Sequence, residues 1–221
     1  MGKLIVIEGL DGSGKGTQAK ILFDTLEKQG RKVKKISFPV YDSDSSALVR
    51  MYLAGQFGSK PGDVNAYAAS SFYAVDRFAS FKADWEKLYN DDYVIIADRY
   101  TTSNGVHQCS KLDESLWEEF MDWLYDFEYN KMGIPAPDCV IYLDMSPAVS
   151  QKLLSGRYAG DESKKDIHEK DTEYLARSRQ AARFCAEHDK WTVIRCDNGE
   201  NPYTIEEIAQ QVLDTVSTVI E

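Results

Sequence analysis

The fold of this chain is decided by the stretch Gly9-Leu10-Asp11-Gly12-Ser13-Gly14-Lys15-Gly16-Thr17. It follows an apolar run at 4–7 and precedes a helical pattern, so the local order is strand, glycine-rich turn, lysine and helix. Glycines let successive backbone N–H groups curve around an anion, and the first amides of a helix add partial positive charge there. This order is typical of a loop that holds the phosphates of a nucleoside triphosphate, with Lys15 reaching the outer phosphates. The predicted ATP-binding residues are Gly12, Ser13, Gly14, Lys15, Gly16 and Thr17.

The composition favours one α/β domain over residues 1–221. A hydrophobic content of 43% is enough for a substantial core, and no internal repeat or flexible linker divides the chain. The formal net charge of −10 argues against a surface for nucleic acid or for an anionic membrane, because both need a basic field. The expected partners are therefore small molecules.

Cysteine usage and hydropathy indicate a cytoplasmic protein. The cysteines are far apart and form no C-x-x-C pair, so reduced thiols are expected rather than a disulfide framework or a zinc site. No apolar run reaches transmembrane length, and the first strand begins too close to Met1 for a signal peptide.

Short, continuously apolar runs alternate with longer helical patterns. The predicted strands are Lys3–Glu8, Val33–Phe38, Tyr93–Ala97, Cys139–Leu143 and Thr192–Cys196. Continuous apolar runs are typical of strands buried on both faces, and their alternation with helices predicts a parallel sheet with helices on both sides.

Helices are predicted at 15–28, 63–88 and 113–130, with a last helix that begins at a capping box of Thr204 and Glu207. The expected core face of the 63–88 helix consists of Ala68, Phe72, Val75 and Ala79. Apolar residues of this helix and the next fit a dimer face equally well, so a homodimer remains an alternative.

The segment at 155–166 differs from the rest because it is charged and almost devoid of apolar residues. A solvated loop is one interpretation. The other is a mobile lid over the triphosphate, in which Arg157, Lys164 and Lys165 supply local positive charge.

Two further groups of residues point to a site beside the loop. Asp98 and Arg99 follow the third predicted strand, and the carboxyl ends of parallel strands line the ligand crevice. An aspartate there can hold Mg²⁺ through water and an arginine can bind a phosphate, although a structural Asp–Arg pair is an alternative. Tyr73 and Arg77 lie four residues apart on one helix face, where an aromatic ring and a guanidinium can meet a base, or else belong to the core.

Taken together, these residues resemble the thymidylate kinases among the P-loop nucleoside monophosphate kinases. The resemblance rests on Glu8 and the glycine-rich loop, on the motifs Phe38-Pro39 and Ala74-Val75-Asp76-Arg77, and on Asp98-Arg99-Tyr100. It continues through Pro137-Asp138 before the fourth strand and through the charged segment. It implies a three-layer fold with the strand order 2-3-1-4-5.

The resemblance also implies a role for individual residues. Residues implied to bind dTMP are Asp11, Tyr41, Tyr73, Arg77, Arg99, Asn104 and Gln108. Residues implied near Mg²⁺ are Asp11, Thr17 and Asp98. Lys15, Arg99 and the lid residue Arg157 would be catalytic.

Gly16 and His107 are among the positions that depart from the usual family pattern. Gly16 stands where the residue after the loop lysine is usually Ser or Thr, which leaves Thr17 or water for Mg²⁺. His107 stands where an aromatic residue commonly helps to exclude a ribose 2′-hydroxyl.

The expected reaction is in-line phosphoryl transfer from ATP to dTMP, without a covalent intermediate, as a step toward dTTP. Two alternatives stay open. One is a P-loop kinase of another monophosphate or of a nucleoside, for which Glu8 or Asp98 could serve as the base. The other is a regulator that binds ATP without catalysis.

Overall fold

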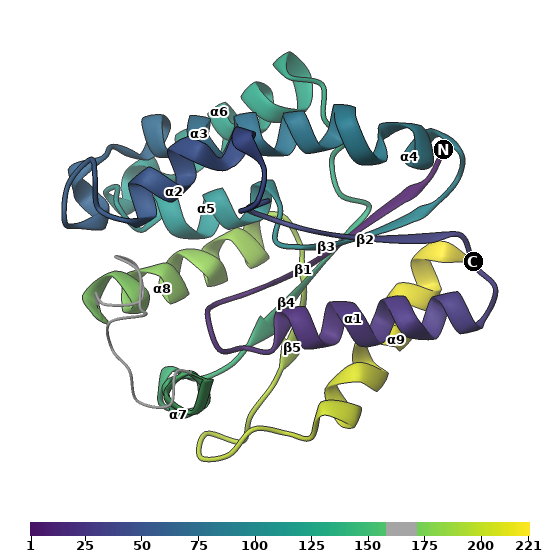
Figure 1. Cartoon of the computed structure of the whole chain (residues 1–221). Helices are drawn as coiled ribbons and strands as arrows, with labels where there is room; N and C mark the ends of the chain where they lie inside the picture. Colours follow the sequence, from purple (N-terminus) through teal and green to yellow (C-terminus); the bar gives the residue numbers. More distant parts are fainter. Residues whose placement is uncertain (158–171) are drawn as a thin grey trace.

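The computed structural model describes residues 1–157 and 172–221, and its centre is one parallel sheet with helices on both faces (Figure 1). The strands are β1 (Lys3–Gly9), β2 (Val33–Ser37), β3 (Val94–Asp98), β4 (Cys139–Asp144) and β5 (Thr192–Arg195). Their order is β2-β3-β1-β4-β5, and all the neighbouring pairs are parallel. The predicted fold class and strand order are confirmed.

The register brings the carboxyl ends of the three central strands together. Ile7 of β1 pairs with Asp98 of β3, and Gly9 pairs with Leu143 of β4. Because the glycine-rich loop leaves β1 at this edge, the residues that follow β3 and β4 lie beside it.

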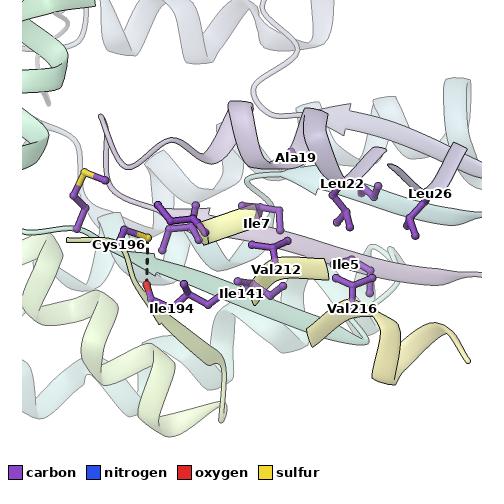
Figure 2. Close-up of a cluster of buried hydrophobic side chains, with 14 of the residues drawn as sticks. Ile5, Ile7, Ala19, Leu22, Leu26, Ile141, Ile194, Cys196, Val212 and Val216 are labelled. Carbon is purple, nitrogen blue, oxygen red and sulfur yellow. Dashed lines mark hydrogen bonds between the residues drawn. The ribbon is translucent and has the colours of Figure 1, made fainter. Parts of the chain in front are cut away.

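One face of the sheet is covered by α1 (Lys15–Lys28) and α9 (Ile205–Ile220) (Figure 1). Figure 2 shows the core between them, where Leu22 and Leu26 of α1 and Val212 and Val216 of α9 meet Ile5 of the sheet. The predicted capping box is present, since Thr204 and Glu207 bond to each other's backbone N–H groups. Burial of this apolar face holds the loop between β1 and α1 against the sheet.

The other helices complete the fold around the opposite face and the sheet edge (Figure 1). They are α2 (Ala47–Leu53), α3 (Ala66–Ser80), α4 (Glu86–Asn90), α5 (Thr101–Cys109), α6 (Trp117–Tyr125), α7 (Pro147–Arg157) and α8 (Thr172–His188). Leu4, Val6, Ile95 and Ala97 face the second core cluster, which includes Trp85 after α3. Successive residues along β1 and β3 therefore pack against opposite faces of the sheet, as expected for strands buried on both sides.

Two long helices predicted from the sequence are interrupted. The 63–88 prediction is replaced by α3, a π-helical turn at Phe81–Trp85 and the short α4. The 113–130 prediction is replaced by a 3₁₀ turn, α6 and a π-helical turn at Asp126–Lys131. Apolar periodicity does not reveal a π turn, because one extra residue per turn leaves the surrounding residues helical.

The predicted core face of α3 is wrong at Val75, whereas Ala68, Phe72 and Ala79 are partly buried. Val75 is 47% exposed and Phe78 is 38% exposed, whereas Ala69, Ala74 and the polar Arg77 are buried. Small residues let α3 approach α5 closely, and the buried polar side chain belongs to a pocket rather than to an apolar core.

Candidate active site

The glycine-rich loop adopts a backbone that needs glycine at two positions. Gly12 and Gly14 have φ values of 79° and 87°, in the left-handed region that side chains disfavour. A Cβ at Gly12 would also lie 2.7 Å from the carbonyl oxygen of Ser150. The hydroxyl of Ser13, between them, is buried and has no hydrogen-bond partner among the described residues. Residues Gly12 to Thr17 of this loop line the cavity in front of it.

Lys15 is held at the start of α1 with its charge only partly compensated. Its Nζ donates to the carbonyl oxygen of Leu10 at 2.9 Å and lies 3.8 Å from Asp11 Oδ1. Burial, together with the nearby positive charge of Arg99, lowers the pKa of Lys15 to about 8. An ammonium group in this state gains from the arrival of an anion, which is what a triphosphate supplies.

A cavity of about 930 Å³ opens in front of the loop, and we call it the donor cavity. All the predicted ATP-binding residues line it. One part of its lining is largely apolar and was not predicted as part of the site; this wall consists of Met145, Leu153, Leu154, Pro202, Tyr203, Ile205 and Ile208. Gln18 Nε2 donates to the carbonyl oxygen of Ile205 at 3.1 Å and so ties this wall to α1.

Arg99 lies directly after β3 at the junction of the donor cavity with a second pocket. Its backbone is left-handed, with φ of 66°, which is uncommon for an arginine and recurs at functional sites. Nη2 donates to Asp11 Oδ1 at 2.5 Å, and Nη1 lies 3.3 Å from both Ser103 Oγ and His107 Nε2. Burial lowers the pKa of Arg99, but the charges of Asp11 and Glu8 outweigh burial and raise it, so the guanidinium is always charged.

Asp11 connects the loop with the second pocket. Burial would raise its pKa, but Arg99 and Lys15 outweigh burial and lower it, so its carboxylate is ionised. This carboxylate lies between two cations, and Lys15, Asp11 and Arg99 form one charged row along the loop.

The second pocket, which we call the acceptor pocket, brings together residues from distant parts of the sequence. All the residues predicted to bind dTMP line it: Asp11, Tyr41, Tyr73, Arg77, Arg99, Asn104 and Gln108. The two cavities share Asp11, Phe38, Pro39, Tyr41 and Arg99. A ligand in one cavity therefore meets a ligand in the other at the row of charges.

The inner end of the acceptor pocket has directional polar groups. Gln108 is fully buried, and neither atom of its amide has a partner among the described residues. Arg77 is 1% exposed and also lines the pocket. A buried amide without partners, in a pocket that a guanidinium also lines, is expected where a ligand completes the hydrogen bonds.

Three buried carboxylates support these side chains and were not predicted as site residues. Glu8 accepts hydrogen bonds from Thr102 Oγ1 at 2.8 Å and Ser103 Oγ at 2.7 Å, and lies 3.5 Å from Arg99. Asp76 accepts from the backbone N–H of Val40 at 2.8 Å, which holds the chain that carries Tyr41.

The third carboxylate, Glu128, forms a bidentate ion pair with Arg77. Glu8 adjoins the glycine-rich loop and Asp76 precedes Arg77, so both lie in motifs that the sequence displays, whereas no local pattern marks Glu128.

All three residues predicted near Mg²⁺ line the donor cavity: Asp11, Thr17 and Asp98. The described residues contain no group of three or more His, Cys, Asp or Glu side chains that would form a closed metal site. One carboxylate and one hydroxyl suit Mg²⁺, which keeps several waters and binds mainly to substrate phosphates. Asp11, the third predicted residue, is already paired with Arg99 and Lys15.

The predicted lid lies almost entirely outside the described residues. The backbone of α7 is described to Arg157, and the Arg157 side chain and residues 158–166 are not.

A phosphate-binding loop whose cavity opens into a second, polar pocket defines a P-loop phosphotransferase with separate donor and acceptor sites. The family model of thymidylate kinases matches residues 7–210, and this chain belongs to that family.

Similar proteins span nearly the whole chain. The thymidylate kinase of Mycobacterium tuberculosis is 29% identical over 199 residues, which cover 88% of this chain and 92% of that protein. The thymidylate kinase of Schizosaccharomyces pombe is 26% identical over 218 residues, which cover 99% and 93%.

Among solved structures, a thymidylate kinase from Candida albicans superposes with a TM-score of 0.72 at 23% identity, covering 98% of this chain and 92% of that one. In the part of the chain that the structure describes, no helix is long and apolar enough to span a membrane.

Proposed function

We propose that this protein transfers the γ-phosphoryl group of ATP directly to dTMP, giving ADP and dTDP. The observation that carries the proposal is the junction of the two cavities at Asp11 and Arg99, with Lys15 on the donor side. A phosphate oxygen of dTMP attacks the γ-phosphorus while the bond to the β-phosphate oxygen breaks, so no covalent intermediate forms on the protein. The family match supports the same reaction.

Charge stabilisation is the main contribution of the protein to this step. Negative charge spreads over the transferred phosphoryl oxygens, and cations fixed nearby stabilise it without reorganising. Lys15 serves the donor phosphates, and Arg99 serves the acceptor phosphate once the dTMP anion competes for it with Asp11. We assign Arg157 the remaining cationic role, in a lid that excludes water from the phosphates.

Thymine recognition falls to the inner end of the acceptor pocket. Arg77 donates hydrogen bonds only, so it suits a base carbonyl, and the Gln108 amide offers one donor and one acceptor edge. Tyr73 lines the same pocket and offers a ring for stacking on the base. The apolar wall around Leu153 and Tyr203 suits the adenine of ATP.

Mg²⁺ fits this donor set, and Thr17 and Asp98 would hold it beside the phosphates. When bound, it neutralises part of the charge on the β- and γ-phosphates.

The two bases named for the nucleoside-kinase alternative are unsuitably placed, because Asp98 lines the donor cavity and not the acceptor pocket. Glu8 is fully buried and its carboxylate already accepts from Thr102 and Ser103, so it does not reach a sugar hydroxyl. Arg99 and Asn104 instead suit a substrate that already carries a phosphate and a base.

An ADP-release assay across dTMP, dUMP, UMP, dCMP, dGMP and thymidine tests the proposal. We expect dTMP to give the highest kcat/KM. Preference for thymidine would overturn the acceptor assignment, and ATP binding without turnover of any acceptor would support a regulator. An Arg157→Ala variant with full kcat would remove Arg157 from the mechanism.

We further propose that two copies of this chain form a homodimer. Each copy is a single domain, acts on small molecules and belongs to the cytoplasm. The outer face of α3 exposes Tyr67, Val75 and Phe78, which an apolar interface would cover. The net charge of −10 disfavours nucleic acid, and the cysteines are free thiols, which suits a reducing compartment. Light scattering tests the dimer: Val75→Glu should reduce the particle mass to that of one 25.0 kDa chain.

A further inference from the structure

Glu128 is a buried carboxylate that gathers the polar side chains of the acceptor pocket without lining it. It lies on the π-helical turn after α6 and is fully buried. Its oxygens accept from Arg77 Nε at 2.7 Å, Arg77 Nη2 at 2.5 Å and Thr101 Oγ1 at 2.9 Å. Asn104 Nδ2 donates to it at 3.4 Å. Arg77 and Asn104 line the acceptor pocket, so Glu128 contacts the ligand site only through them.

The geometry leaves Arg77 with a defined set of free donors. A guanidinium has five N–H groups in a fixed fork. Glu128 accepts from two of them and the carbonyl oxygen of Tyr100 from a third, at 3.4 Å. The remaining two N–H groups are available to a ligand, and their direction is set because Glu128 holds one whole edge of the fork.

We propose that Glu128 is a positioning residue that sets base selection by fixing Arg77 and Asn104 in their orientation. This inference rests on the proposed function and adds a determinant of its specificity. Two N–H donors held in place donate to the carbonyl oxygen of thymine or uracil and oppose the exocyclic amine of cytosine, which is itself a donor. If Arg77 were free to turn, it could withdraw from that amine, and the discrimination would fall.

A carboxylate is the side chain that can perform this task. A neutral amide at position 128 would turn an N–H donor toward the donors of Arg77, Thr101 or Asn104. A purely structural ion pair would stabilise the fold but would leave the choice of base unchanged. Base discrimination is therefore the readout that separates the two roles.

The test compares Glu128→Gln with Glu119→Gln, which removes the same charge from an exposed position on α6. For each variant kcat/KM is measured with dTMP and with dCMP at saturating ATP, together with KM for ATP and the melting temperature. We expect Glu128→Gln to lower the dTMP-to-dCMP ratio by about tenfold or more, mainly through a higher KM for dTMP. KM for ATP should stay within about twofold of wild type, and Glu119→Gln should match wild type throughout.

Two further variants keep the test decisive if Glu128→Gln does not fold. Glu128→Asp keeps the charge and shortens the side chain, and should give an intermediate ratio. Arg77→Gln/Glu128→Gln removes both charges and should match Arg77→Gln alone in its ratio, since Glu128 acts through Arg77. A wild-type ratio in a folded Glu128 variant would overturn the inference. Failure of the wild-type protein to phosphorylate dTMP would instead overturn the proposed function.

Discussion

The donor loop and the acceptor pocket meet at the same charges but are built in different ways. The donor loop is one continuous stretch, Gly9–Thr17, whose shape follows from its glycines and the helix behind it. The acceptor pocket draws its polar groups from α3, α5 and the glycine-rich loop, and buried carboxylates orient them, among them Glu128 on the turn after α6. A phosphate site can therefore be encoded locally, whereas recognition of a base depends on contacts between distant segments.

The largest expected effect tests the donor side alone. Lys15→Ala should lower kcat by about 10²–10³-fold, because it removes a fixed cation from the transferring phosphoryl group. The dissociation constant for dTMP, measured by calorimetry without ATP, should stay within about twofold of wild type. A comparable loss of dTMP affinity would show that the two sites are not separable at this residue.

The next effect tests the acceptor side alone. Gln108→Leu should lower kcat/KM for dTMP by about 10–100-fold, because a buried ligand then loses its hydrogen-bond partners. KM for ATP should not change. The ligand-free variant should melt at the same or a higher temperature, since the Gln108 amide has no partner in the described part of the chain. A lower melting temperature would mean that the amide has a structural role.

The pH dependence should distinguish the two substrates. The pKa of Lys15 in the free protein is about 8, so its ammonium is the main form below pH 8 and is lost as the pH rises through that value. Accordingly kcat/KM for ATP should fall about tenfold per pH unit above 8. With ATP saturating, bound phosphates keep Lys15 charged, so kcat/KM for dTMP should show no such fall up to about pH 9. Parallel profiles for both substrates would contradict this picture.

The smallest effect concerns the apolar wall of the donor cavity. Thr204→Ala removes the capping box of α9 and should lower the free energy of unfolding by about 1 kcal/mol, as measured with urea. KM for ATP should rise by less than about threefold, and KM for dTMP should not move. An equal effect on both substrates would argue against a separate donor wall.

Local signals predicted the framework well. The strand predictions differ from the structure by at most one residue at each end, and the helix Lys15–Lys28 has the predicted bounds. Such signals failed where the environment overrides periodicity. The π turns interrupt both long helices, and α3 turns Val75 outward, because its buried face lines a polar pocket through Tyr73 and Arg77 rather than an apolar core.

The sequence by itself determined the phosphate-binding loop, the alternation of buried strands with helices, and the residue types of the acceptor pocket. These follow from glycine stereochemistry and apolar periodicity, which act over a few residues, and from motifs typical of the family. Only the tertiary structure decided that Glu128 pairs with Arg77 and that Glu8 lies against Arg99. A buried charge needs a partner, and the packing of distant segments determines which opposite charge lies next to it. Those pairings join residues far apart in the chain, and no local pattern specifies them.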